Sequence, residues 1–427
     1  MHPINGIRHH IPSFTALVAL IVIAGAFFIY QERYGSVNYV SMGPFYAPGL
    51  EVPVPNHPVP QPATAPLHAI QPRITLGSAD IIASSSNIFA YAHATLAVDG
   101  KIFIGMSDAA GNPFAPNQLV IFGDPADISH ATIISLPITA DIETMTYDHL
   151  YDKVYFMFSD NHALKVYSID PHTYLMSLVM STTSVDVGRR PAIVTDGEYI
   201  YGITNTDPSK VFKIGIHGGG LTVSDIGHIR FGHSAAIGIY GSSTELYFGG
   251  GMDNGFEKVD AATLQPIAAE TISPCSMSDD MPYVQTSSST GYVYVGCETA
   301  PYGIRVNTSD MSYERFTLPG ASLGLFSYGP DIYNASQDGY IDIFPKGDLT
   351  DLRRYKVAAK AYHLDTKGQD LQINEILYVP ETGKLYLTAW YGVPGLYEVS
   401  IGPDKGQNTA AAIDALKPSG FVPQAIY

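Results

Sequence analysis

Six polar residues that could bind a ligand or transfer protons stand just ahead of repeated apolar segments in this sequence. They comprise two imidazoles, three carboxylates and a guanidinium: His93, Glu143, Arg190, His233, Asp280 and Glu375. Imidazoles and carboxylates hold divalent cations and serve as general acids and bases. The four side chains that best suit a metal ion are His93, His233, Glu143 and Glu375. Spacing does not fix the direction of a side chain, so ordinary solvated loop residues are the alternative interpretation.

A repeat of about 47 residues predicts the elements that would position these side chains. Seven β-rich segments have an aromatic or apolar centre, at Phe103, Tyr155, Ile200, Tyr247, Tyr294, Tyr333 and Tyr386. In most copies an apolar strand and a turn rich in Asp, Gly, Ser or Pro precede the central strand, and two further strands follow it. This period is close to the roughly 40–50 residues of a four-stranded propeller blade. The pattern therefore predicts an all-β fold, a seven-bladed β-propeller over residues 71–406.

The seventh copy lacks a convincing fourth strand after Val399. The apolar residues 74–76, which precede the first copy, would supply that strand and join the two ends of the ring. Such a join removes open sheet edges. In a closed ring the first strand of each blade lines a central channel, so the six polar residues would surround one channel mouth.

The repeated hairpins, with Asp-Gly at 99–100 and 196–197, resemble those of seven-bladed propellers of the YVTN and streptogramin-lyase type. The tyrosines that match the repeat aromatic are Tyr155, Tyr247, Tyr294, Tyr333 and Tyr386. The resemblance covers residues 74–406 and implies the architecture. A lyase activity is only a possibility, because the Trp-Phe-Thr-Glu signature of those lyases is absent and no catalytic residue can be mapped. Trp-Asp pairs of the WD40 type are also absent.

One segment formally matches a serine hydrolase. Residues 320–324 read Gly-x-Ser-x-Gly around Ser322, and residues 217–220 read His-Gly-Gly-Gly. That chemistry needs a strand, a sharp turn and a helix to raise the serine. The residues after Ser322 are typical of strand, turn and strand instead, so the glycines are expected to serve blade turns.

Composition divides the chain into five parts. They are a short cytoplasmic N-terminus (1–13), a transmembrane signal-anchor helix (14–30), a Pro-rich extended linker (31–70), the propeller (71–406) and a C-terminal tail (407–427). Residues 14–30 carry no charge and are just long enough to span a bilayer. Basic residues precede them, which favours a cytoplasmic N-terminus and a propeller in the periplasm or extracellular space. Cleavage as a signal peptide is the alternative, although the small-residue site lies inside the apolar run.

Charge and cysteine content narrow the range of partners and compartments. Forty acidic against 23 basic residues give a formal charge of −17, which disfavours nucleic acid and anionic lipid surfaces as partners. The two cysteines are Cys275 and Cys297. In an oxidising compartment a single disulfide is the simplest prediction, and two buried thiols are the alternative.

These features favour a membrane-anchored, extracytoplasmic module that binds or scaffolds a protein partner or a small-molecule ligand. Tyrosines are frequent interface anchors, and no strong catalytic motif is present. The first alternative is an extracytoplasmic lyase or hydrolase with a metal- or acid/base-assisted site at the channel mouth, where a divalent cation would be the cofactor. The second alternative is an accessory subunit of a larger membrane complex.

Overall fold

The computed structural model describes most of the repeat region. The described residues are 74–84, 92–106, 118–123, 131–136, 142, 144–160, 163–188, 190–240, 243–251, 254–277, 281–287, 290–336, 339–356, 372–379, 381–391 and 395–403. All of them belong to one compact unit, residues 42–427. Among them, no helix is long and apolar enough to cross a membrane. The predicted anchor (14–30), linker (31–70) and tail (407–427) lie outside the described residues.

The described residues form seven antiparallel sheets of four strands each, which we number as blades. Blade 1 contains β2 (Ala92–Val98), β3 (Lys101–Met106), β4 (Gln118–Phe122) and β5 (Ala131–Ser135). Blade 2 contains β6 (Thr144–Asp148), β7 (Lys153–Asp160), β8 (Ala163–Ile169) and β9 (Met176–Thr182). Blade 3 contains β10 (Ala192–Thr195), β11 (Tyr199–Ile203), β12 (Lys210–Gly215) and β13 (Leu221–Asp225).

The remaining blades have the same up-and-down order. Blade 4 contains β14 (Gly232–Tyr240), β15 (Ser243–Gly250), β16 (Gly255–Asp260) and β17 (Pro266–Thr271). Blade 5 contains β18 (Tyr283–Gln285), β19 (Gly291–Gly296), β20 (Tyr302–Asn307) and β21 (Tyr313–Thr317). Blade 6 contains β22 (Ser322–Tyr328), β23 (Asp331–Ser336), β24 (Tyr340–Pro345) and β25 (Arg353–Lys356). Blade 7 contains β26 (Gln372–Val379), β27 (Lys384–Tyr391), β28 (Gly395–Pro403) and β1 (Ile74–Ser84).

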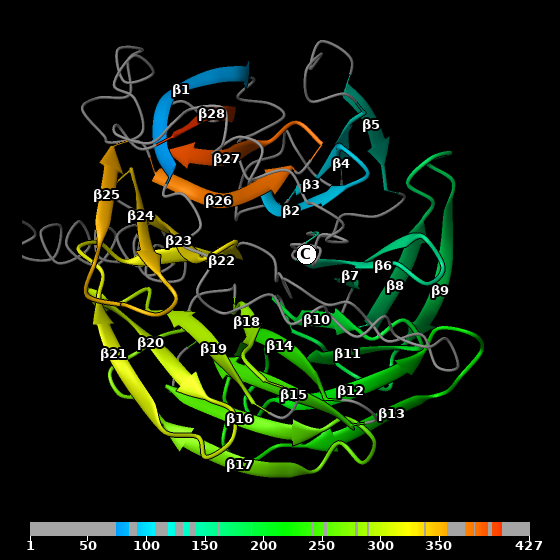
Figure 1. Ribbon diagram of the computed structural model, residues 1–427. Coiled ribbons are helices and arrows are strands. Elements are labelled where there is room, and N and C mark those ends of the chain that lie inside the picture. Colours follow the sequence, from blue (N-terminus) through cyan, green and yellow to red (C-terminus); the bar gives the residue numbers. More distant parts are fainter. Residues whose placement is uncertain are drawn as a thin grey trace, which may run out of the picture. The chain divides into compact units, whose positions relative to one another are not determined.

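Blade 7 closes the ring with a strand from each end of the repeat region, as the sequence predicts. Strand β1 pairs antiparallel with β28, and Ile74 is opposite Pro403. Successive blades touch all the way round. Inner strands meet in the pairs β2 and β6, β6 and β10, β10 and β14, β14 and β18, β22 and β26, and β26 and β2, whereas between blades 5 and 6 the second strand β19 meets β22. Figure 1 shows the first strand of each blade around the centre of the ring and the fourth strand at its rim.

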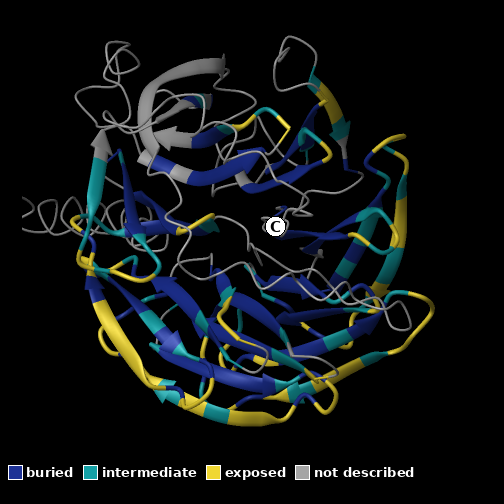
Figure 2. Ribbon diagram, viewed as in Figure 1, coloured by how far each residue is buried: buried dark blue, intermediate teal, exposed yellow. Residues whose placement is uncertain are grey.

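The core lies between neighbouring blades, where the repeat residues pack. Between blades 7 and 1, Ile102 and Ile104 pack in one cluster with Leu377 and Tyr386. All seven repeat centres are buried, from 0 to 3% exposed. Exposed residues gather on the outer strands, as Figure 2 shows for β13, β17 and β21. The repeated aromatic or aliphatic residue of the sequence therefore lies on the second strand of each blade, and both faces of that strand are covered.

The hairpin between β6 and β7 shows how a turn residue is fixed. Asp148 ends β6, and its Oδ1 accepts hydrogen bonds from the backbone N–H groups of Leu150 (2.8 Å) and Tyr151 (3.3 Å). The Asp148 side chain is fully buried, and Oδ2 has no hydrogen-bond partner among the described residues. Burial raises the pKa of Asp148 from 3.8 to about 6, despite the two backbone donors. The folded protein therefore binds a proton here more tightly than the unfolded chain does.

This raised pKa predicts a pH-dependent contribution to stability. The contribution is fully present below about pH 4 and is lost as pH rises through about 6, because the buried carboxylate then ionises. We expect Asp148→Asn to reduce the fall in unfolding free energy between pH 4 and pH 8 by roughly 3 kcal/mol, taking about 1.36 kcal/mol per pKa unit. Denaturant unfolding at several pH values measures this difference. The exposed Asp225→Asn is the control, and identical pH profiles for wild type and Asp148→Asn would contradict the prediction.

Candidate functional site

One predicted site residue, His233, lies at the seam between blades 4 and 5. It is the second residue of β14, at the end of the blade where the chain enters the first strand, which we call the entry end. Its Nδ1 lies 3.2 Å from the carbonyl oxygen of Met277 and 3.9 Å from Oε1 of Glu298. Both side chains of this His–Glu pair are nearly buried, 6% and 7% exposed. A Cβ on Gly251 would come within 3.2 Å of the imidazole, so glycine permits this close approach.

The contacts of His233 determine its chemistry. A carbonyl oxygen only accepts hydrogen bonds, so Nδ1 carries the hydrogen that it donates to Met277. In the neutral ring Nε2 is then the basic nitrogen. The nearby Glu298 carboxylate would stabilise the imidazolium form by Coulomb attraction. The arrangement is therefore capable of accepting a proton.

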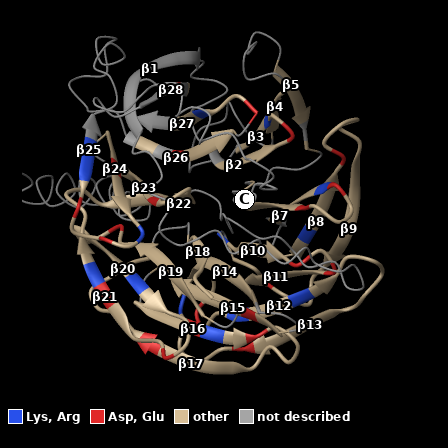
Figure 3. Ribbon diagram, viewed as in Figure 1, with Lys and Arg blue, Asp and Glu red and all other residues tan. Residues whose placement is uncertain are grey.

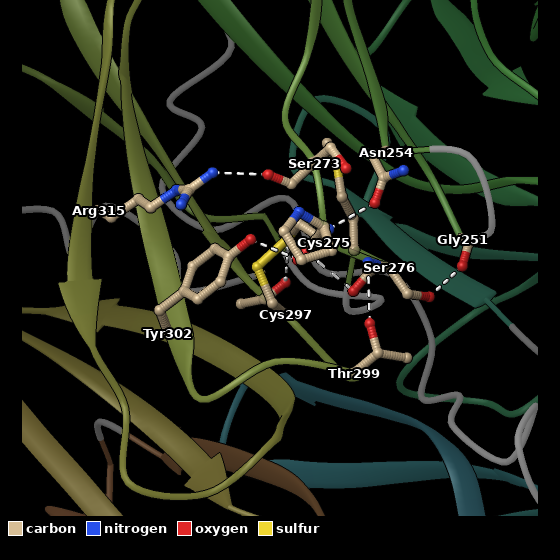
Figure 4. Close-up of a disulfide and its surroundings, with 12 residues drawn as sticks. Gly251, Asn254, Ser273, Cys275, Ser276, Cys297, Thr299, Tyr302 and Arg315 are labelled. Carbon is tan, nitrogen blue, oxygen red and sulfur yellow. Dashed lines mark hydrogen bonds between the residues drawn. A yellow bond between two sulfur atoms is a disulfide. The ribbon is translucent and has the colours of Figure 1, made fainter.

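A disulfide holds the segment that supplies the Met277 carbonyl. This segment, residues 273–277, lies in the connection from β17 to β18, and we call it the strap. Cys275 of the strap is bonded to Cys297, 22 residues later, just after β19. Met277 also pairs with Cys297 as an isolated β-bridge. The two cysteines for which the sequence predicts a disulfide thus join the strap to blade 5 (Figure 4).

Hydrogen bonds attach the strap to both neighbouring blades. On the blade 5 side, Glu298 N–H donates to the Ser276 carbonyl (2.8 Å), and Ser276 N–H donates to Thr299 Oγ1 (3.3 Å). On the blade 4 side, the Ser276 hydroxyl donates to the carbonyl of Gly251. Met277 N–H donates to the Gly250 carbonyl (3.2 Å). The strap is thereby fixed across the seam where His233 lies.

Two long side chains complete the attachment at the other end of the strap. The Tyr302 hydroxyl donates to the Pro274 carbonyl, and Arg315 Nη2 donates to the Ser273 carbonyl at 2.6 Å. The Arg315 guanidinium lies over the Tyr302 ring, 4.7 Å from its centroid. Figure 4 shows both side chains pointing toward the strap from blade 5. Each strap residue from 273 to 277 therefore has a described contact with a neighbouring blade.

Two buried serine hydroxyls belong to residues close to the strap or to its disulfide partner. Ser234 on β14 and Ser322 on β22 are fully buried, and neither hydroxyl has a hydrogen-bond partner among the described residues. Gly249 leaves room for Ser234, because a Cβ there would stand 2.5 Å from its Oγ. Ser322 N–H donates to the Cys297 carbonyl at 3.1 Å. Since an unpaired buried hydroxyl costs free energy, a polar group that reached either serine would gain a favourable contact.

The structure describes the other predicted channel-mouth residues only in part. Glu375 lies on β26 and is fully buried, and Arg190 is half-buried two residues before β10. His93 belongs to β2, but its side chain is outside the described part of the chain, and Glu143 and Asp280 are outside it altogether. Convergence of the six residues on one mouth, and a metal ion held by His93, His233, Glu143 and Glu375, thus stay predictions. The described neighbours of His233 include Met277 and Glu298, which the sequence analysis did not select.

The serine-hydrolase match has the structure that the sequence analysis expects. Ser322 is the first residue of β22, so a strand follows it rather than a helix. Residues 217–220 lie in the exposed connection between β12 and β13, in blade 3. The nucleophile elbow that such a hydrolase requires is therefore absent from this part of the described chain.

The comparisons with known proteins identify the fold but assign the chain to no family. No protein-family model matches the chain, and no curated protein matches it in sequence. A chain of the mitotic checkpoint complex superposes with a TM-score of 0.54 at 10% identity, over 82% of this chain and 96% of that chain. The fold is a seven-bladed β-propeller. The Pan2 WD40 domain of Neurospora crassa gives the same TM-score at 11% identity, over 79% of this chain and 97% of that chain. At such low identity, the likeness to both structures shows only a shared architecture.

Removal of the disulfide is expected to weaken the propeller around the strap. A cross-link that closes a loop of about 20 residues contributes about 3 kcal/mol in the chain-entropy description. We expect Cys275→Ser/Cys297→Ser to lose about that much unfolding free energy in denaturant titrations. The chain has no other cysteine, so a reductant present during unfolding should destabilise the wild type and leave the double variant unchanged. Equal stability of the oxidised wild type and the double variant would contradict the prediction.

Proposed function

We propose that this chain is a membrane-anchored, extracytoplasmic propeller that binds or scaffolds a partner through the entry end of blades 4 and 5. The observation that carries the proposal is the strap, which a disulfide and hydrogen bonds hold against two blades. A loop fixed in this way loses little conformational entropy when a partner binds. The partner is a protein or a small molecule that meets the strap, His233 and the surrounding loops.

The disulfide also supports the proposed compartment. Stable disulfides are typical of oxidising spaces and rare in the cytosol. The apolar segment 14–30 would anchor the chain with its N-terminus in the cytoplasm, and the Pro-rich segment 31–70 would act as a semi-rigid spacer. The propeller would then lie in the periplasm or the extracellular space. The repeat resembles that of YVTN and streptogramin-lyase propellers, and from this resemblance we infer the type of propeller but no activity.

Charge favours protein or small-molecule partners over nucleic acid. The chain carries a formal charge of −17, and Figure 3 shows acidic and basic residues interspersed along the strands rather than a basic stripe. Phosphate backbones are bound by clustered Lys and Arg. The structural neighbour in the mitotic checkpoint complex is part of an assembly, and a scaffolding role here would be of the same general kind.

Site-specific photo-crosslinking in the native host tests the binding surface. A photoreactive residue replaces the exposed Thr299, beside the strap, or the exposed Ala262, in the turn between β16 and β17 at the opposite end of blade 4. The change at Thr299 removes one hydrogen bond to Ser276 but leaves the disulfide and the other contacts of the strap in place. We expect one reproducible adduct from position 299 of the full-length chain and none from position 262. Because the strap fixes this surface, the adduct should be lost in Cys275→Ser/Cys297→Ser. Mass spectrometry identifies the adduct, and either no adduct at 299 or identical adducts at both positions would contradict the proposal.

A lyase or hydrolase is the second candidate, and the His233–Glu298 pair favours it. A nearly buried imidazole with a carboxylate 3.9 Å away resembles a general base held in one orientation. In this candidate the base is at the same entry end as the proposed binding surface. An accessory subunit of a membrane complex, held through segment 14–30, would use the surface in the same way as the binding module.

Replacement of His233 separates the enzyme from the binding module. If the full-length chain cleaves any member of an ester, lactone and glycoside panel, we expect His233→Gln to reduce the rate by about 10²–10⁴-fold with an unchanged melting temperature. The matched control is His228→Gln, because this half-buried imidazole lies only five residues before His233, in the connection that leads into β14. Full activity of His233→Gln would rule out His233 as the base.

A further inference from the structure

Three side chains from three turns meet at the end of the ring opposite the strap. Asp99 lies in the turn between β2 and β3, Asp152 in the turn between β6 and β7, and His172 in the turn between β8 and β9. One potential ligand atom from each lies within 4.8 Å of the other two. The set therefore joins blade 1 to blade 2 at the hairpin ends of their strands.

The distances within the set suit a shared cation. His172 Nε2 lies 2.7 Å from Asp152 Oδ2 and 3.6 Å from Asp99 Oδ2. Ligand atoms that each stand about 2.0–2.2 Å from one tetrahedral Zn²⁺ are roughly 3.3 Å from each other. Small side-chain movements would therefore bring the three atoms into a coordination shell. Without a cation, the same imidazole and Asp152 form a hydrogen-bonded pair.

Further hydrogen bonds orient two of the three side chains. The nearly buried Tyr147 hydroxyl donates to Asp152 Oδ1 at 2.7 Å, which leaves Oδ2 directed at His172. Burial and the Asp152 carboxylate keep the pKa of Tyr147 well above its usual value, so the hydroxyl stays a donor. Asp170 Oδ1 accepts the backbone N–H of His172 at 3.0 Å, and its Oδ2 accepts Lys153 Nζ at 2.6 Å. Contacts of this kind behind metal ligands fix their orientation.

The turns themselves also favour this placement. Asp99 and Asp152 both adopt left-handed backbone conformations, with φ of 47° and 53°, which Asp and Asn tolerate better than most residues. The three side chains are 43 to 53% exposed, so an ion can enter from solvent and keep water in its remaining positions. The geometry thus provides three protein ligands and an open side.

We propose that Asp99, Asp152 and His172 form a binding site for a divalent transition-metal ion, with Zn²⁺ the best match, that links blades 1 and 2. An imidazole nitrogen beside two carboxylates suits Zn²⁺, whereas Ca²⁺ and Mg²⁺ prefer all-oxygen sites. Protons compete with the metal for the imidazole nitrogen, so binding weakens in acid. This site lies at the opposite end of the blades from His233 and does not rest on the proposed function.

Calorimetric titration with Zn²⁺ tests the site in the full-length chain, purified in mild detergent and stripped with a chelator. We expect one Zn²⁺ per chain and little or no heat with Ca²⁺. Replacing a residue that hydrogen-bonds to a metal ligand costs about 10–100-fold in metal affinity. We therefore expect Tyr147→Phe to weaken Zn²⁺ binding by about 10–100-fold and His172→Ala to weaken it at least as much. Asp99→Asn should weaken binding with the turn intact, because Asn also tolerates a left-handed conformation.

The matched control is His217→Ala, since His217 is an exposed histidine in the corresponding β12–β13 connection of blade 3. It should bind Zn²⁺ as the wild type does, and circular dichroism should show the same fold for every variant. The proposal is overturned if the wild type binds no Zn²⁺, which leaves His172 and Asp152 as a hydrogen-bonded pair only. It is also overturned if His172→Ala and Asp99→Asn keep full affinity, or if binding is lost in His233→Ala instead.

Discussion

Strand β1 pairs with β28, so blade 7 is built from both ends of the repeat region and the ring has no free gap. This pairing matters because a four-stranded sheet buries its apolar faces only against a neighbour on each side. Every blade uses its second-strand aromatic or aliphatic residue for that purpose. Opening the ring at blade 7 would expose the faces that Ile104 and Leu377 now cover. Closure is thus a condition for all seven cores at once.

A closed ring also fixes which connections meet. Chain entries and the links from second to third strands gather at one end of each blade, and the remaining turns gather at the other. The strap and His233 therefore share the entry end, while Asp99, Asp152 and His172 share the opposite end. Both clusters lie at seams, where two successive repeats each contribute side chains. A single blade could supply neither the Met277–His233 contact nor the Asp99–His172 contact.

The fold could be predicted from the sequence because its repeat residues recur at a similar spacing and are all buried on the second strand of a blade. Tyr247 and Tyr294 are equivalent in spacing and equally buried, and Ile74 pairs where the missing strand was expected. The sites were less predictable because their residues come from connections that do not repeat. Glu298 follows Cys297 in a link of no regular pattern, and spacing from His233 gives no sign of their contact. The Asp-Gly pair at 99–100 is fully explained by a hairpin turn, so the sequence gives no reason to assign the Asp99 side chain a further role.

The two aspartates of the β6–β7 hairpin show why local sequence cannot settle such roles. Asp148 and Asp152 are four residues apart in one turn, yet Asp148 is fully buried and Asp152 is 43% exposed. Burial raises the pKa of Asp148 to about 6, so this carboxyl affects stability. Asp152 instead meets His172 of its own blade and Asp99 of blade 1. The difference arises from the neighbours that each side chain meets, and those neighbours come from connections brought together only in the folded ring.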